Sequence, residues 1–206
     1  MNITLLTEQQ QQTTTMYDKM KASVYIALTL DGYIAKTDGS VTFLDEYQTL
    51  ASTEDGDMGF SDFLSTVDLL VMGRKTWDTV ISFGEEVWPY GDRQVWIWST
   101  QHPSNINIPE CRKKQTRVVS SSPMQIMKEA KKEGYTKVYV DGGSTIQSFL
   151  KNECVGELIL TRVPLILGNG IPLFSSTNNQ PLAHIKTVTY SNGLVQSHYR
   201  VPPNIV

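Results

Sequence analysis

Two short segments of the chain combine glycine with hydroxyl and cationic side chains in a way that suits a phosphate ligand. Gly73–Thr76 (GRKT) follows the apolar run Val67–Met72, and Gly142–Thr145 (GGST) follows the run Lys137–Val140. Glycine lets the backbone approach a ligand closely, and the unpaired N–H groups at a helix start attract anions. Arg74 adds a planar guanidinium that is always charged. The two segments predict strand-to-helix junctions that bind the pyrophosphate of a dinucleotide.

A third segment, Ser99 and Thr100, ends another expected strand, and its hydroxyls suit the 2′-phosphate of an adenosine ribose. Ser144 and Thr145 are also expected to cap the helix that they open. Each segment alone has a simpler interpretation: a strand-to-helix turn, a surface arginine or a plain loop. The spacing G-x-G-x-x-G is absent, so the sequence lacks the usual dinucleotide fingerprint. Because all three segments follow an expected strand, we favour a dinucleotide site.

Composition excludes several classes of function. The 206 residues suit one domain, and the net charge of −3 gives no general positive field for nucleic acid. Cys111 and Cys154 lie far apart without a C-x-x-C motif, and the three histidines are scattered, so we expect no metal site. No segment approaches the roughly 18 apolar residues of a membrane span or resembles an export signal. We therefore expect a cytoplasmic protein that binds neither nucleic acid nor membrane.

Apolar periodicity and turn residues predict one α/β domain behind a polar tail. Residues 1–20, rich in glutamine and threonine, are expected to be a disordered tail, and residues 21–206 the domain. We expect helices at Phe43–Ala51, Phe60–Leu64, Arg74–Ile81, Pro123–Glu133 and Thr145–Leu150. We expect strands at Ser23–Leu30, Val67–Met72, Gln94–Ser99, Thr116–Val119, Lys137–Val140, Glu157–Val163, Ile185–Tyr190 and Leu194–Val201.

The order of these elements favours a mixed, mostly parallel sheet. Strands alternate with helices through most of the chain, and Asn192-Gly193 between two alternating runs predicts a C-terminal antiparallel hairpin. Tyr33–Thr37, between two Asp-Gly turn signals, is expected to be a loop.

Five segments carry a resemblance to the dihydrofolate-reductase-like fold, whose order they follow: Ala27–Ala35, Val71–Trp77, Trp96–Thr100, Val140–Ser144 and Leu158–Thr161. Two more, Tyr25–Gly32 and Leu165–Phe174, are more similar to one branch of it. That branch is the C-terminal reductase domain of bacterial bifunctional riboflavin deaminase-reductases and its stand-alone relatives. The resemblance covers about Ala22 to Arg200 and implies a three-layer fold, a central sheet flanked by helices.

The resemblance also implies NADPH as the cofactor. Ala27 and Ile34 would line its nicotinamide end, Arg74 and Thr76 would hold phosphates, and Ser99 and Thr100 would lie near the 2′-phosphate. The remaining implied contacts surround the pyrophosphate at the glycine-rich junctions, namely Gly73, Gly142, Gly143, Ser144, Thr145 and Ile146.

The resemblance places the proton donor less directly. Folate-reducing members keep an acid on the helix before the strand that ends at Gly73, which gives Asp57, and Thr161 matches the threonine that pairs with it. Such a carboxyl in an apolar pocket is expected to have a raised pKa; the alternative is a solvated carboxylate in the acidic loop. Lys36 and Arg162 are candidates for holding a substrate 5′-phosphate. The Trp-x-x-Pro motif of folate sites is missing, so dihydrofolate is not the favoured substrate.

The first hypothesis is an NADPH-dependent reductase that reduces the ribosyl group of a phosphoribosylaminopyrimidine or a related heterocycle. The alternatives are a dihydrofolate or pteridine reductase and a non-catalytic NADPH-binding module that kept the fold. A weaker alternative is a partner-binding protein whose Trp96 and Trp98 pack a dimer interface. The resemblance also implies a homodimer.

Overall fold

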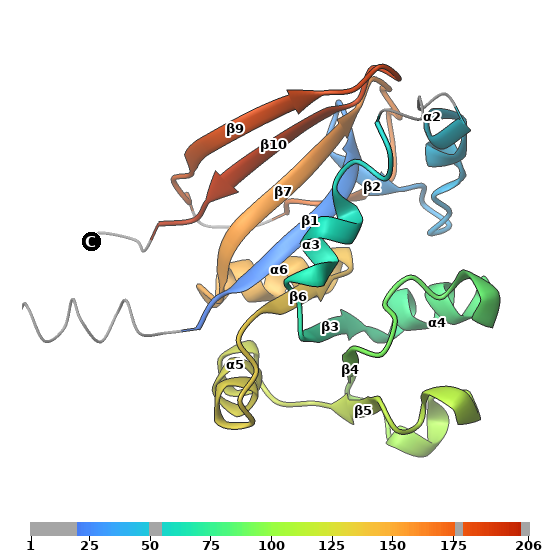
Figure 1. Ribbon diagram of the computed structural model, residues 1–206, viewed down its shortest axis with the longest axis vertical. Coiled ribbons are helices and arrows are strands. Elements are labelled where there is room, and N and C mark those ends of the chain that lie inside the picture. Colours follow the sequence, from blue (N-terminus) through green and yellow to red (C-terminus); the bar gives the residue numbers. More distant parts are fainter. Residues whose placement is uncertain (1–19, 50–54, 176–178, 203–206) are drawn as a thin grey trace, which may run out of the picture.

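The computed structural model describes residues 20–49, 55–175 and 179–202, so most of the predicted tail lies outside the described residues. The described residues form an eight-stranded sheet and a small two-stranded sheet (Figure 1). The order in the large sheet is β5 (Thr116–Val119), β4 (Gln94–Trp98), β3 (Leu69–Gly73), β6 (Val138–Asp141), β1 (Ala22–Thr29), β7 (Val155–Val163), β10 (Val195–Arg200) and β9 (Ala183–Thr189).

The first six strands in this order are parallel, and β10 runs antiparallel to both β7 and β9. Two backbone hydrogen bonds close the β9–β10 hairpin: the Tyr190 N–H donates to the Leu194 carbonyl, and the Gly193 N–H, at a residue with φ +83°, donates to the Tyr190 carbonyl. The predicted α/β class, the mixed and mostly parallel sheet, and the C-terminal hairpin are therefore confirmed.

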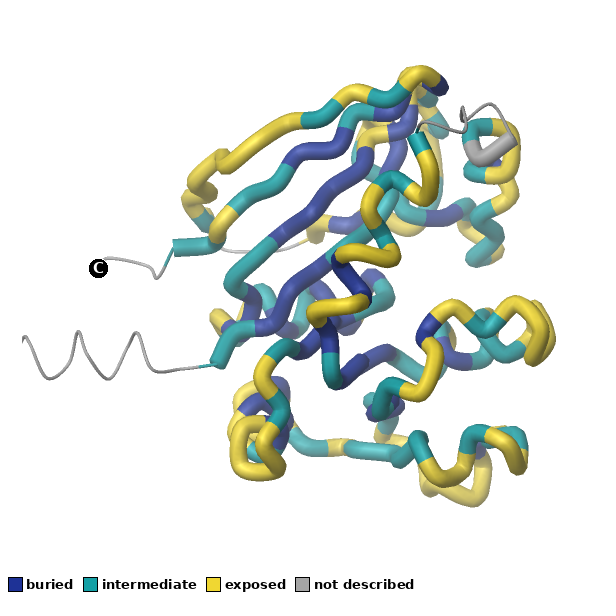
Figure 2. The backbone as a smooth tube through the Cα atoms, in the orientation of Figure 1, coloured by how far each residue is buried: buried dark blue, intermediate teal, exposed yellow. Residues whose placement is uncertain are grey.

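Helices cover both faces of the sheet, which gives the three layers. On one face, α5 (Pro123–Lys132) and α6 (Gly143–Lys151) pack into a core with β1, β3 and β6. On the other face, α3 (Phe60–Ser65) and α4 (Arg74–Ser82) pack through Phe63, Leu64 and Trp77. The short α2 (Asp45–Thr49) follows a 3-10 turn at Thr42–Leu44. Figure 2 shows the consequence: the central strands are buried, whereas the edge strand β9 is exposed.

The best-signalled helix forms as its sequence predicts. Ser122 accepts the N–H of Gln125 and the Gln125 side chain returns to the Ser122 N–H, which completes a capping box in front of Pro123. Gly134, at φ +90°, follows the end of the helix. Further 3-10 turns lie at Glu85–Val87, Pro103–Asn105 and Glu110–Arg112.

The two-stranded sheet corrects one prediction. Tyr33–Ala35, expected to be part of a loop, forms β2 and pairs with β8 (Ile171–Pro172). The Asp31 carboxylate accepts the N–H groups of Leu167 and Gly168, which ties the two segments together. A strand of three residues leaves no readable periodicity, and its partner lies far along the chain, so the sequence signal was too weak.

Trp96 is a core residue. It is only 1% exposed, and the Arg117 guanidinium lies 3.7 Å above its ring. Trp98 packs edge-on against Phe149. The interpretation of Trp96 as part of a dimer interface is therefore wrong, because its ring is already buried within its own chain. Of the helices that the structure describes, none combines the length and apolar character that a membrane span requires.

Candidate functional site

The carboxyl ends of β4, β3, β6 and β1 lie at one edge of the sheet, where open α/β folds bind ligands. β3 runs into α4 through Gly73, and β6 runs into α6 through Gly142. Within the described chain, neither helix has a side-chain cap or an acidic residue in its first turn. No side chain therefore caps the first N–H groups inside either described helix, although the Asp141 carboxylate accepts the N–H of the N-cap residue Gly142.

The two junctions interlock through their glycines and threonines. A Cβ on Gly73 would meet Thr145 Oγ1 at 2.7 Å, and a Cβ on Gly142 would overlap Thr76 Oγ1. Each glycine thus receives the threonine from the helix of the other junction. Ile34 Cδ1 occupies the corresponding position at Gly143, at 2.6 Å from where a Cβ would stand. Small residues are required here because two helices and β2 converge on them.

The structure bears on the roles predicted for Ser144, Thr145 and Ile146 at these junctions. Ser144 and Thr145 do not cap α6, because the helix already begins at Gly143 with Gly142 as its N-cap. Ile146 does not cradle a ligand, since its side chain is fully buried in the core and its N–H donates to the Gly142 carbonyl. Thr145 is also fully buried, but its Oγ1 finds no hydrogen-bond partner among the described residues.

Arg74 stands at the first position of α4, as predicted, and its guanidinium bonds the Asp78 carboxylate one turn along the helix. The hydroxyl of Thr76, which is predicted to hold phosphate, lies against Gly142 of the other junction. Gly73 pairs with Trp98 across the β3–β4 ladder, so Arg74 lies close to the segment that begins at Ser99.

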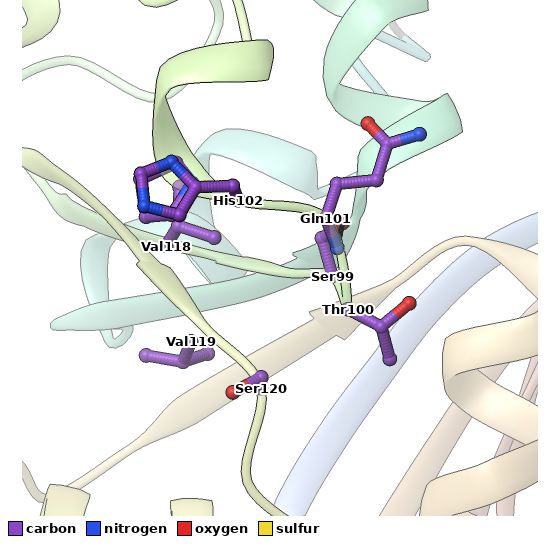
Figure 3. Close-up of a pocket in the computed structure, with 8 residues that line it drawn as sticks. Ser99, Thr100, Gln101, His102, Val118, Val119 and Ser120 are labelled. Atoms are coloured by element: carbon purple, nitrogen blue, oxygen red, sulfur yellow. Dashed lines mark hydrogen bonds between the residues drawn. The ribbon is translucent and has the colours of Figure 1, made fainter.

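Ser99 and Thr100 line a pocket of about 320 Å³ at the end of β4 (Figure 3). Figure 3 shows the side chains of Thr100 and Gln101 pointing away from His102 and Val118, which also line the pocket. Ser99 Oγ accepts the N–H of Gln101, which leaves the Ser99 O–H proton available to a ligand. The structure thus keeps both predicted hydroxyl residues together beside the Arg74 junction.

A smaller pocket of about 100 Å³ contains the predicted catalytic pair. Ala27 and Thr161 are register partners on β1 and β7, and Asp57 faces them from the segment before α3. The complete lining consists of Tyr25, Ala27, Leu44, Tyr47, Asp57, Met58, Thr161, Val163 and Leu194. The structure thus brings Asp57, Thr161 and Ala27 together in one pocket, and their roles stay a prediction.

The expected raised pKa of Asp57 is wrong. Hydrogen bonds from Ser61, including its N–H at 2.7 Å, and from the Gly59 N–H at 3.1 Å lower the pKa of this carboxyl. These donors lie at the start of α3, and they favour the charged form because each donates a hydrogen bond to the carboxylate. Asp57 is exposed as well, so desolvation is too small to reverse the effect.

Sequence reasoning missed Gln196, which organises the floor of this pocket. Its amide nitrogen donates to Thr161 Oγ1 at 3.1 Å, to Tyr25 Oη at 2.8 Å and to the Met58 carbonyl at 3.2 Å. Met58 has the left-handed φ of +58°, and its carbonyl also accepts the Tyr25 and Tyr190 hydroxyls. Burial raises the pKa of Tyr25 to about 12. No sequence signal marks Gln196, since its role depends on β10 pairing with β7.

Sequence reasoning also missed Asp141, the last residue of β6. Desolvation raises the pKa of its carboxyl, although the Gly142 N–H at 2.7 Å and the Tyr90 hydroxyl at 3.3 Å both donate to it. The residue as a whole is partly exposed at the carboxyl end of β6. A carboxylate at the end of an apolar strand, directly before Gly-Gly, was the available signal.

The two cations proposed for a substrate phosphate differ in position. Arg162 lies between Thr161 and Val163, which line the smaller pocket, so its side chain points to the opposite face of β7. Arg162 therefore does not line this pocket, and its role toward a substrate phosphate stays a prediction. Lys36 Nζ donates to Thr42 Oγ1 at 3.2 Å, two residues before the pocket residue Leu44.

The strand order, the three layers and the two glycine junctions define a dihydrofolate-reductase-like α/β fold. The chain belongs to the RibD C-terminal domain family, whose family model matches residues 21–196. It is 32% identical over 180 residues to the uncharacterized protein YwjB of Bacillus subtilis, covering 87% of this chain and 97% of that protein. It is 28% identical over 183 residues to YyaP of the same organism, covering 84% and 91%.

Solved structures agree. A protein from Shewanella sp. PV-4, described as a riboflavin biosynthesis protein, is 33% identical with a TM-score of 0.79, covering 89% of this chain and all (100%) of that one. A Thermotoga maritima diaminohydroxyphosphoribosylaminopyrimidine deaminase/5-amino-6-(5-phosphoribosylamino)uracil reductase has a TM-score of 0.68 at 13% identity, covering 91% of this chain and 58% of that one. At that identity the second likeness supports the fold alone.

Proposed function

We propose that this protein is an NADPH-dependent reductase that transfers hydride to a ribosylaminopyrimidine or a related nitrogen heterocycle. One observation carries the proposal: two interlocked helix starts, without acidic residues in their first turns, open side by side next to Arg74. That arrangement suits a dinucleotide, because the backbone N–H groups can hold its pyrophosphate and the guanidinium can bind its 2′-phosphate. The buried Thr145 hydroxyl, which lacks a partner among the described residues, lies against Gly73 at the same junction.

The remaining donors fit the other parts of NADPH. Ser99 and Thr100 would bind the 2′-phosphate together with Arg74, and Ala27 with Ile34 would enclose the nicotinamide end. When bound, NADPH would supply the hydride. The small pocket beside Ala27 would receive the substrate ring and exclude water from it.

The carboxyls of Asp57 and Asp141 would have different roles toward the substrate. Asp57, whose pKa is lowered, would stay charged and orient an N–H edge of the heterocycle. Asp141, whose pKa burial raises, is better suited to supply the proton that follows hydride addition. We therefore propose Asp141 as the proton donor in place of Asp57, because it also ends β6, the parallel neighbour of the strand β1 that carries Ala27. Thr161 and Gln196 would hold the groups around the small pocket.

A steady-state assay of NADPH oxidation tests the proposal, with a phosphoribosylaminopyrimidine and a dihydropteridine as substrates. We expect turnover of one of them, with a rate that falls as pH rises through the raised pKa of Asp141. Asp141→Asn should abolish that dependence and lower the rate about 100-fold. NADPH binding without turnover of any substrate would favour a non-catalytic module.

The ionised Asp57 carboxylate favours one second candidate, a pteridine reductase, because a carboxylate pairs well with the adjacent N–H groups of an aminopteridine. Preferential turnover of the dihydropteridine would select it. On the strength of the family resemblance we also propose a cytoplasmic homodimer. Light scattering and cell fractionation test these two properties.

A further inference from the structure

Arg74 already has an anionic partner within its own helix. Its guanidinium bonds the carboxylate of Asp78, four residues along α4, and the two side chains are 33% and 42% exposed. Asp78 therefore neutralises a cation whose residue begins α4 next to the segment of Ser99 and Thr100. Because both groups reach solvent, the pair can open without disturbing the core.

We propose that Asp78 competes with the cofactor 2′-phosphate for Arg74 and thereby limits the preference of the protein for NADPH over NADH. This inference rests on the proposed function. NADPH and NADH differ only in the 2′-phosphate, so Arg74 must leave Asp78 for one cofactor and not for the other. The cost of opening the pair falls on NADPH alone, which makes Asp78 a determinant of specificity.

The pair also opposes the ligand electrostatically. A phosphate bound to Arg74 would lie near the Asp78 carboxylate, one helical turn away, and like charges at that range repel. A partly exposed ion pair restrains its partners only weakly, by roughly a factor of two. Together with the relieved repulsion, removal of the Asp78 charge should tighten NADPH binding about three- to tenfold and change NADH binding less than twofold.

Titrations of the full chain with NADPH and NADH, followed by tryptophan quenching, provide the test. Asp78→Asn is the informative variant, because asparagine keeps the size of the side chain and removes its charge. Asp62→Asn, on the exposed first turn of α3, is the matched control that changes net charge equally. We expect Asp78→Asn, and not Asp62→Asn, to raise the ratio of NADH to NADPH dissociation constants. An unchanged ratio would overturn the inference.

A double-mutant cycle tests the route through Arg74. In an Arg74→Ala background, Asp78→Asn should raise the ratio clearly less than it does in the wild type, because no guanidinium remains to be released and only the direct repulsion is relieved. If Asp78→Asn raises the ratio equally in both backgrounds, Asp78 does not act by occupying Arg74 and the inference fails. The binding fragments 2′,5′-ADP and 5′-ADP should reproduce both results without any turnover.

The same titrations separate this inference from the proposed function. If the wild type binds NADPH and Asp78→Asn does not change the ratio, only the role of Asp78 is wrong. If neither nucleotide binds to the folded wild type, the proposed function and the inference fall together. Circular dichroism of each variant establishes that a lost affinity does not reflect a lost fold.

Discussion

Replacing Gly142 by alanine tests whether the two junctions interlock as described. The backbone of Gly142 has a φ of +91°, which costs a residue with a Cβ about 1–2 kcal/mol. The new methyl group would also overlap the Thr76 hydroxyl, and overpacking of this kind costs about 1–3 kcal/mol. Gly142→Ala should therefore lower the free energy of unfolding by about 2–5 kcal/mol.

Gly73→Ala separates the cost of the steric overlap from the cost of the positive φ. Gly73 has a φ of −70°, which any residue adopts, so only the approach of Thr145 Oγ1 at 2.7 Å opposes the methyl group. The expected loss is about 1–3 kcal/mol. Gly39→Ala is the converse control, because Gly39 has a φ of +87° and a Cβ there would meet no described atom within 4 Å. It should lose only about 1–2 kcal/mol.

Second substitutions should rescue the two variants to different extents. Thr145→Ala should restore most of the stability of Gly73→Ala, because it removes both the overlap and a buried hydroxyl that has no partner among the described residues. Thr76→Ala should restore only the overpacking part in Gly142→Ala and leave the cost of the positive φ. Urea denaturation measures all these free energies. Full stability of Gly142→Ala, or no rescue in either pair, would refute the reciprocal packing.

Three further predictions concern the polar groups of the site, and urea denaturation across a range of pH measures each of them. The pKa of Asp141 is raised in the folded protein, so its ionised form destabilises the fold. Asp141→Asn should therefore become more stable than the wild type as pH rises above about 4. An equal effect of the substitution at all pH values would contradict the raised pKa. Asp57→Ala should lower the free energy of unfolding by about 1 kcal/mol at neutral pH, because Asp57 accepts N–H groups at the start of α3. This loss should shrink as pH falls through the lowered pKa of Asp57. Gln196→Leu should lower the free energy of unfolding by about 1–3 kcal/mol, because the Thr161 hydroxyl and the Met58 carbonyl each lose a hydrogen-bond partner. An unchanged stability would contradict the role of Gln196 beside the pocket.

The elements that were predictable from the sequence are those whose signals are local. Pro123–Lys132 has a cap, a first-turn proline and a terminal glycine within its own segment, so its bounds were nearly correct. Leu69–Gly73 is buried on both faces and is almost purely apolar, as a central parallel strand should be. Tyr33–Ala35 became a strand only through a partner far along the chain, and no local pattern encodes such pairing.

In the candidate site, too, the residues that the sequence predicted are those whose signals are local. Gly73, Arg74 and Ser99 follow strands directly, so their residue types and positions were enough to predict a common edge. Gln196 joins the pocket through strand pairing, and the sign of the Asp57 pKa shift depends on N–H groups of α3 that only the folded backbone aligns. Thr76 and Ile146 have suitable positions, but packing turns the first toward Gly142 and buries the second.

The central claim is that the helix starts beside Arg74 bind NADPH. Tryptophan quenching on titration with NADPH and NADH tests it most directly in the wild type, in Arg74→Ala and in the neighbouring control Lys75→Ala. We expect the wild type to prefer NADPH, and Arg74→Ala to weaken NADPH binding roughly 10- to 100-fold, as loss of a charged hydrogen bond does, and to remove the preference. Lys75→Ala should retain the preference. Failure of the folded wild type to bind either nucleotide, or an undiminished preference in Arg74→Ala, would contradict the claim.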